Sequence, residues 1–442
     1  MWDDISRMAD LSTAGTRFDA YLERLGEAVG HADRLEPLRA YLTGLLLPGD
    51  RKSVEPMAAR VDPRHASARH QSMHHFVASA PWDDRELLGV AVDHALLQME
   101  RHAPVGAWVV DDTEFPKKGS HSVGVSHQYC GALGKEENCQ AVVSVSLVNA
   151  TMSVPAAYRL YLPEAWAEDG ARRKEAGVPE EVVFRKKWQL ALEEIGRLLA
   201  EDLPPAPVVA DAGYGDIHGF REGLDALGLS YVVAVRSTTT LWPPGMGPLL
   251  PEQRTRGRRG PPPRRLGRDA EHQPCTARDI ALSLAPEEWK SVRWRDGTRG
   301  RMHSRFAALR VRSAYRENQR QEPWPEQWLL IEWPKGAEEP ADYWLSTLPQ
   351  DADLQDLVGL LKLRWRIERD YEELKGELGL DHYEGRGWRG FHHHGVLCIA
   401  AYAFLAAERA RLSPPQALAF LHAPELPRGF RPRGAALARG AP

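Results

Sequence analysis

The sequence has little cysteine and no long apolar run. Its four cysteines are scattered over 442 residues without a CxxC pair (Cys130, Cys139, Cys275 and Cys398). This spacing offers no zinc or disulfide framework and is typical of reduced thiols in a cytoplasm. No apolar run approaches the roughly 18 residues of a membrane span, and the first ten residues lack the basic and apolar regions of a secretion signal. We therefore expect neither a membrane segment nor a leader.

The chain also lacks an excess of positive charge. Its formal net charge is −4 with 27% charged residues, so composition alone does not indicate a nucleic-acid-binding protein. Arginine is concentrated locally instead, with seven arginines in residues 254–268, RTRGRRGPPPRRLGR. A segment so rich in proline cannot form a packed strand or helix. It is either a phosphate-binding loop or a solvated one.

Residues 361–380, LKLRWRIERDYEELKGELGL, predict one amphipathic helix. Four apolar positions share one stripe at helical spacing: Leu363, Ile367, Leu374 and Leu378. The neighbouring stripe carries Arg364, Glu368 and Lys375. A glutamate held beside cations on a rigid helix suits a metal-binding carboxylate whose substrate is a polyanion. The alternative is a surface helix with an ordinary i,i+4 salt bridge between Arg364 and Glu368.

Two short apolar segments end in aspartates. Residues 107–115, AWVVDDTEF, deliver Asp111 and Asp112, and residues 207–215, PVVADAGYG, deliver Asp211 before a glycine-containing turn. Together with Glu368 they make a set of hard oxygen ligands in the order D, D, E, as two-metal phosphoryl transfer requires. Neighbouring strand residues point to opposite faces, so Asp111 and Asp112 should not both face one metal.

These segments resemble the DDE transposases of bacterial insertion sequences, in the group marked by a Tyr–Arg–Glu–Lys signature. Arg364, Glu368 and Lys375 match the signature in type and spacing, whereas Leu361 stands at the tyrosine position. Residues 127–140, 208–216 and 377–390 are also similar to one branch of that group, and the resemblance runs from about residue 60 to about residue 410. The family pattern of Asp, any residue, Thr selects Asp111, which precedes Thr113.

The resemblance implies an enzyme that cuts and joins strands of double-stranded DNA at element ends and target. Asp111, Asp211 and Glu368 would be catalytic and would hold two Mg²⁺ ions, with Mn²⁺ as a substitute. A homodimer on DNA is expected, in the bacterial cytoplasm and on the nucleoid when DNA is bound. Two alternatives remain open: a domesticated DNA-binding regulator, and a metal-dependent DNA nuclease on the same fold.

Several basic residues are candidates for DNA contact. Lys117 and Lys118 follow the first aspartates in a turn, and Arg364 and Lys375 would bind phosphates beside the metals. Arg386 and Arg389 flank an aromatic residue, which suits a DNA backbone or an ordinary polar loop. The consecutive histidines 392–394 point in different directions on any regular element, so they are not expected to share a metal.

The predicted fold class is α/β, an RNase H-like mixed sheet with flanking helices, an N-terminal helical region and a β-rich insertion domain. In that fold the first and fourth strands are neighbours, so Asp111 and Asp211 would meet. We expect a helical, DNA-binding region at residues 1–104 and the first part of the catalytic core at 105–236. The insertion with its basic loop would span 237–344, the second part of the core 345–412, and a partly disordered tail 413–442.

Overall fold

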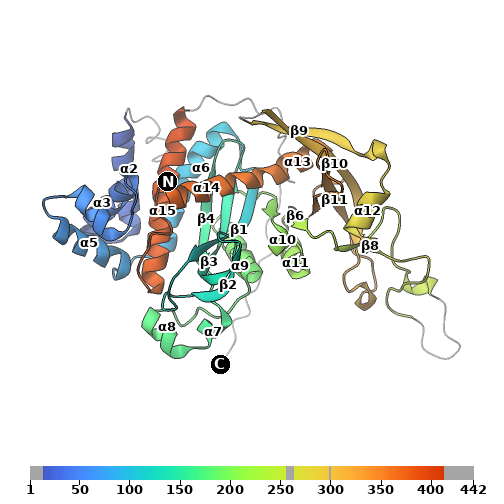
Figure 1. Ribbon diagram of the computed structural model, residues 1–442, viewed down its shortest axis with the longest axis horizontal. Helices are drawn as coiled ribbons and strands as arrows, with labels where there is room; N and C mark the ends of the chain where they lie inside the picture. The colour runs from blue at the N-terminus through green and yellow to red at the C-terminus, as the bar shows by residue number, and fades with distance from the viewer. Residues whose placement is uncertain (1–12, 255–262, 298–299, 413–442) are drawn as a thin grey trace.

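The computed structural model describes residues 13–254, 263–297 and 300–412. The predicted tail at 413–442 and most of the arginine-rich loop lie outside the described residues. Figure 1 shows an elongated molecule, with helices at one end, a sheet in the middle and further strands at the other end. No helix in the described ranges is long and apolar enough to cross a membrane.

From residue 13 onward, where the description of the structure starts, five α-helices precede the first strand: α2 (Ala14–Ala28), α3 (Leu35–Leu46), α4 (Val54–Val61), α5 (Ala66–Ala78) and α6 (Asp84–His102). Side-chain oxygens cap two of them, since Thr13 accepts from the backbone N–H of Thr16 and Asp83 accepts from those of Arg85 and Glu86. Their apolar faces form a core with the long C-terminal helix α15 (Trp388–Leu412). The predicted helical character of this region is therefore present in the structure.

The central strands have RNase H-like order. Strands β1 (Ala107–Pro116), β3 (Lys135–Val148) and β4 (Ser153–Leu160) form an antiparallel meander, with β2 (Ser126–Cys130) paired to the start of β3. Strand β5 (Val208–Ala210) then lies parallel to β1, and β6 (Tyr231–Val235) lies parallel to β5. The predicted fold class, a mixed sheet with helices on its faces, is confirmed, and the hairpin of β2 is an addition to it.

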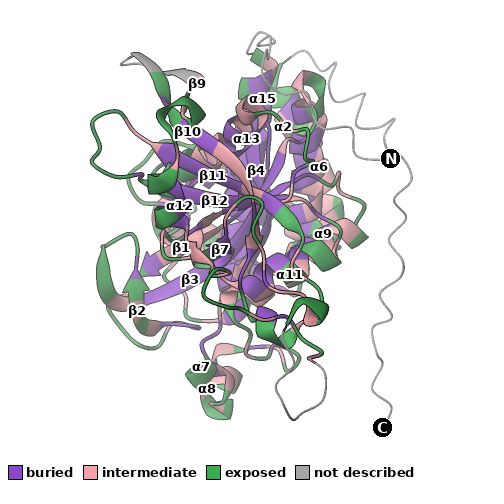
Figure 2. Ribbon diagram, turned by 90° about the vertical axis from the view of Figure 1, so that its right-hand side faces the viewer, coloured by how far each residue is buried: buried purple, intermediate pink, exposed green. Residues whose placement is uncertain are grey.

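Strands from residues 237–344 continue the same sheet. Strand β12 (Asp342–Ser346) pairs antiparallel with β6, followed by β11 (Glu326–Trp333), β10 (Gly300–Ser313), β7 (Thr240–Trp242) and β8 (Cys275–Thr276). Strand β9 (Lys290–Gly297) pairs with β10, and α12 (Ala277–Ser283) follows β8. Figure 2 shows that most strands of this sheet are buried and that the loops at its ends are exposed, whereas β2 is only partly buried.

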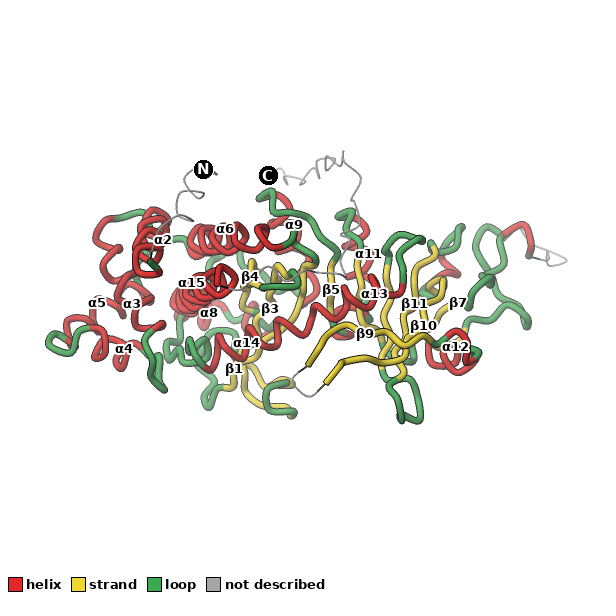
Figure 3. Tube along the Cα trace, turned by 90° about the horizontal axis from the view of Figure 1, so that it is seen from above, coloured by secondary structure: helices red, strands yellow, loops and turns green. Residues whose placement is uncertain are grey.

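Helices cover both faces of the central strands. On one face lie α9 (Lys187–Ala200) and α11 (His218–Ala226), with the short α7 (Glu164–Ala167) and α8 (Gly170–Ala176) before them. On the other face lie α13 (Leu354–Leu361) and α14 (Trp365–Gly376), which Figure 3 shows crossing the sheet beside β9 and β10. The two faces have separate cores, one containing Trp108 and Val110, the other Val109 and Val209.

The helix predicted at 361–380 is shorter in the structure, because a 3₁₀ turn separates it from the preceding helix α13. Helix α13 ends at Leu361, the turn spans Lys362–Arg364, and α14 ends at Gly376. The apolar stripe is as predicted, because Leu363, Ile367, Leu374 and Leu378 are all buried. The tighter turn changes the phase between the two helices. Helix α13 packs against β6, β9 and β10, whereas α14 packs against β4.

The apolar pattern of residues 396–408 predicts a last helix that starts at Val396. In the structure this helix, α15, begins eight residues earlier, at Trp388. Three consecutive histidines interrupt the apolar pattern of the sequence at the start of this helix. In the structure, however, His392, His393 and His394 are all buried. Each makes hydrogen bonds of its own: His392 Nδ1 to the Trp388 carbonyl, His393 Nδ1 to the Val77 carbonyl, and His394 Nε2 to the Gly379 carbonyl. These histidines are core residues with separate partners, as buried polar groups require.

Candidate active site

Strands β1 and β5 bring two aspartates together from positions 100 residues apart: Asp111 lies within β1, which continues to Pro116, and Asp211 directly follows the end of β5. The parallel register pairs Val109 with Val209 and Val110 with Ala210. Asp111 follows on the face that β1 presents to α13 and α14, because it has the parity of buried Val109. Asp211 follows Ala210 directly and is near enough to Asp111 for its charge to add to the rise that burial causes in the pKa of Asp111.

Asp211 is fixed by the turn that follows β5. It is the N-cap residue of α10 (Ala212–Gly215), and its Oδ1 accepts from the backbone N–H of Gly213 at 2.9 Å and of Tyr214 at 3.4 Å. A glycine ends this short helix because a Cβ at Gly215 would lie 2.1 Å from the carbonyl oxygen of Ala234 on β6. The glycine-containing turn predicted after Asp211 therefore has a packing reason, and it leaves Oδ2 available.

Arg364 joins Asp111 to Glu368. Its Nη2 lies 3.2 Å from Asp111 Oδ2, and its Nη1 lies 3.1 Å from Glu368 Oε1. The Glu368 side chain is 64% exposed, so this i,i+4 pair contributes only about 0.3–0.5 kcal/mol. Glu368 can therefore exchange Arg364 for another positive partner at little energetic cost.

Burial makes the Asp111 carboxylate hard to ionise. Desolvation is the largest cause that raises its pKa, to about 6, and the neighbouring charge of Asp211 adds to the rise while Arg364 opposes it. A dication beside these oxygens would favour the ionised form in the same way as Arg364 does, but more strongly. The donor set of carboxylate oxygens therefore fits Mg²⁺ or Mn²⁺.

The three carboxylates do not form a closed ligand set in this structure. Among the residues that it describes, no three His, Cys, Asp or Glu side chains lie close enough together to hold a metal ion as they stand. Asp111 and Asp211 are neighbours, whereas Glu368 is turned toward Arg364. A metal held by all three would require Glu368 to leave Arg364.

Asp112 belongs to the opposite face of β1. Its Oδ2 lies 2.6 Å from Lys187 Nζ at the start of α9, and its Oδ1 accepts a hydrogen bond from the Tyr214 hydroxyl. Burial lowers the pKa of Lys187, but the charge and hydrogen bond of Asp112 outweigh it and leave the pKa raised. Sequence reasoning found neither Lys187 nor Tyr214, because no local pattern links positions 75 and 102 residues away from Asp112.

The comparisons with known proteins fit this geometry. A sequence model of the family described as DDE superfamily endonuclease matches residues 24–301, which is more than half of the chain. The chain belongs to the DDE endonuclease superfamily.

A relative is similar over a shorter stretch. The chain is 32% identical over 168 residues to the probable transposase for insertion sequence element IS701 of Microchaete diplosiphon. The matched part is 38% of this chain and spans about two fifths, 41%, of the relative. The family match contains Asp111 and Asp211 but ends before Glu368, so the choice of Glu368 rests on the fold and on the helix motif.

Two of the predicted DNA-binding residues lie near the carboxylates. Arg364 contacts Asp111 and Glu368, whereas Lys375, on α14, contacts β1 further along that strand. The Lys375 ammonium donates to the Glu114 carbonyl at 3.0 Å and lies 5.2 Å from the centre of the Phe115 ring. Burial lowers its pKa. In this arrangement Lys375 ties α14 to β1 three residues beyond Asp111.

Three other predicted cations share one cavity. Lys117, Lys118 and Arg386 line a hollow of about 430 Å³, together with Arg51 from the N-terminal helices. Lys117 donates to the Tyr383 carbonyl at 3.0 Å, and burial lowers its pKa, whereas Lys118 and Arg386 are exposed. Sequence reasoning missed Arg51, whose segment lies far from the others in the chain.

Arg389 is separate from that cavity. It is exposed and donates to the Ser79 carbonyl at 2.9 Å, beside a different cavity that Asp84 and Glu194 also line. Trp388, the aromatic residue between the two predicted arginines, is buried in the core. The structure therefore does not bring Arg386 and Arg389 together around an exposed ring.

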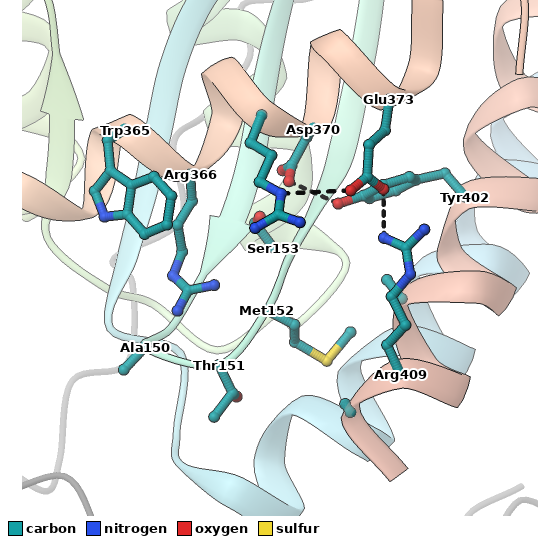
Figure 4. Close-up of a pocket in the computed structure, with 13 residues that line it drawn as sticks. Ala150, Thr151, Met152, Ser153, Trp365, Arg366, Asp370, Glu373, Tyr402 and Arg409 are labelled. Atoms are coloured by element: carbon teal, nitrogen blue, oxygen red, sulfur yellow. Dashed lines mark hydrogen bonds and ion pairs between the residues drawn. The ribbon is translucent and has the colours of Figure 1, made fainter. Parts of the chain in front are cut away.

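The face of α14 opposite Glu368 carries a further cavity of about 220 Å³. Figure 4 shows Glu373 between two guanidinium groups, and the Tyr402 hydroxyl donating to Asp370 at 2.6 Å. Glu373 pairs with Arg369 at 3.5 Å and with Arg409 on α15. These contacts hold α14 against α15 and leave its other face to the carboxylates.

Proposed function

We propose that this chain is a transposase that cuts and joins DNA strands at the ends of an insertion sequence. The observation that carries the proposal is the meeting of Asp111 and Asp211 on the adjacent parallel strands β1 and β5, beneath the helix that bears Glu368. Membership of the DDE endonuclease superfamily and the similarity to a probable transposase support it.

In this proposal Asp111, Asp211 and Glu368 are the catalytic carboxylates. They would hold two Mg²⁺ ions, or Mn²⁺, once Glu368 leaves Arg364. Bound there, the ions supply the positive charge that stabilises the attacking and leaving oxygens of a phosphodiester. Arg364, already beside Asp111, would then donate to a phosphate oxygen in place of Glu368.

The cavity lined by Lys117, Lys118 and Arg386 would bind the DNA backbone, because three cations gather there on segments that lead away from the carboxylates. We assign the helices within residues 1–104 to the same task of gripping element ends, and residues 237–344 to an insertion joined to the catalytic parts at 105–236 and 345–412. Two ends must be held together for joining, so we propose a homodimer on DNA.

The test is strand cleavage of DNA that carries the element's own ends, with Mg²⁺ and with chelator. Glu368→Gln is the catalytic variant, and Glu372→Gln is the matched control, because Glu372 is also exposed on α14. We expect metal-dependent cuts and joined products with the unmodified protein and the control, and neither with Glu368→Gln.

Each alternative has its own outcome in the same assay. Cuts without joined products would indicate a nuclease. Binding of the ends without cuts in any variant would indicate a regulator. Equal cleavage by Glu368→Gln would remove Glu368 from the site.

A further inference from the structure

Lys362, at the start of the 3₁₀ turn between α13 and α14, lies in a cage of aromatic rings. Its ammonium is 4.4 Å from the centre of the Trp294 ring, 5.4 Å from that of Phe306 and 5.8 Å from that of Trp344. It also lies 2.7 Å from Oε2 of Glu332. The four partners come from β9, β10, β12 and β11, and we call the five residues the Lys362 cage.

The cage is a largely desolvated ion site. The Lys362 side chain is 22% exposed and that of Glu332 only 9%. Phe306 is fully buried, and Trp294 packs edge-on against it with ring centres 5.8 Å apart. Aromatic faces and one carboxylate replace the water that the ammonium loses, and cation–π attraction is strongest in such a place. A leucine in this position could fill the space but would leave Glu332 without its partner.

The turn that Lys362 opens ends at Arg364, the residue that contacts both Asp111 and Glu368. Only one residue, buried Leu363, separates the cage from that contact. The strands of the insertion also hold α13, since Gln355 Nε2 donates to the Arg293 carbonyl at 2.9 Å. Residues of the insertion thus contact both α13 and the first residue of the turn that leads into the candidate catalytic helix α14.

We propose that Lys362 is a positioning residue, and that its cage couples the insertion strands to the direction in which Arg364 and Glu368 point. The cage anchors the 3₁₀ turn, the turn sets the rotation of α14, and the rotation places Arg364 and Glu368 over Asp111 and Asp211. The proposal rests on the proposed function for its effect on cleavage, and on the structure alone for its effect on the turn.

Four variants, one of them a control, separate the charge of Lys362 from the shape of the cage. Lys362→Met keeps the length of the side chain and removes its charge, whereas Lys362→Arg keeps a cation for Glu332 and the rings. Arg310→Met is the matched control, because Arg310 lies 5.0 Å from the Trp328 ring in the same sheet and belongs to no part of the site. Trp294→Leu removes the aromatic ring that is nearest to the Lys362 ammonium and leaves Lys362 itself unchanged.

The first measurement is single-turnover cleavage of end DNA at saturating protein, with the affinity for that DNA measured in parallel. We expect Lys362→Met and Trp294→Leu to lower the cleavage rate about tenfold or more, because a small misplacement of a positioned group has a large kinetic effect. DNA affinity should stay within about twofold, Lys362→Arg should recover most of the rate, and Arg310→Met should match the unmodified protein. An unchanged rate in Lys362→Met, or no recovery in Lys362→Arg, would overturn the proposal.

The second measurement needs no activity. Hydrogen exchange of the amides of residues 362–368 is followed in the protein without DNA or metal. Exchange should be faster in Lys362→Met, and should return toward the original rate in Lys362→Arg and stay unchanged in Arg310→Met. Equal protection in Lys362→Met and the unmodified protein would refute the cage, whereas an unmodified protein that never cuts DNA would refute only the proposed function.

Discussion

Two carboxyl groups near α14 share the same perturbed pKa but should respond differently to metal. Burial raises the pKa of Asp111 to about 6, and burial also raises that of Asp370 to about 6. Asp111 lies at the proposed metal site beside Asp211. Asp370 lies on the other face of α14, in the cavity that Arg366, Arg369 and Arg409 line (Figure 4).

The magnitude follows from the shift. Each group rises from an ordinary value of 3.8, and a rise of about two units corresponds to about 3 kcal/mol. A carboxyl whose pKa is raised in the folded protein destabilises it when ionised. The full penalty is therefore present above pH 6, shrinks as the pH falls through 6, and is gone below the ordinary value.

Asp111→Asn and Asp370→Asn remove this penalty one group at a time. In urea unfolding at pH 8 with chelator, each variant should be more stable than the unmodified protein by up to about 3 kcal/mol, and the gain should disappear toward pH 4. Added Mg²⁺ should stabilise the unmodified protein and Asp370→Asn but not Asp111→Asn, because only Asp111 is proposed to hold the ion.

Two results would refute the reasoning. If neither variant gains stability at pH 8, burial does not raise these pKa values as the structure indicates. If Mg²⁺ stabilises Asp111→Asn as much as the unmodified protein, Asp111 is not a ligand and the site must be reassigned.

Three further predictions concern the surroundings of the site. Replacing Lys117 and Lys118 by alanine should weaken DNA binding and lower the salt slope of the affinity by about two, without changing stabilisation by Mg²⁺; an unchanged slope would remove them from the interface. Lys187→Met should destabilise the fold by about 3 kcal/mol in urea, because it leaves the largely buried Asp112 carboxylate without its cationic partner. Adding Asp112→Asn should recover most of that loss, and no recovery would mean that Lys187 acts through packing. Leu374→Ala should cost about 2–5 kcal/mol of unfolding free energy, since Leu374 is fully buried; a loss below 1 kcal/mol, about that of a surface change, would contradict its place in the core.

The spacing of apolar residues correctly predicted which side chains are buried where a single helix packs one of its sides against the core. The stripe through Leu363, Ile367 and Leu374 predicted which side of the helix packs, and all three are buried. The same pattern could not show the 3₁₀ turn at Lys362–Arg364. That turn is fixed by partners on four strands, and nothing in residues 361–380 encodes those strands.

The start of one helix was predicted wrongly because polar residues are buried in it. The histidines 392–394 read as a polar loop, yet they are inside α15 because each finds hydrogen-bond partners elsewhere in the fold. Burial of a polar side chain depends on partners that the sequence does not place, so the start of α15 was predicted eight residues too late.

The sequence by itself determined the apolar segments that lead into Asp111 and Asp211, the amphipathic helix that carries Glu368, and the mixed α/β fold class. These follow from periodicity within a few residues of chain. Only the tertiary structure decided which aspartate faces α14, that Arg364 rather than a third carboxylate meets Asp111, and that Lys187 and Lys362 have their charged partners on other elements. The physical reason is that charge and burial act through space, between atoms that the register of the strands and the packing of the helices bring within a few ångströms.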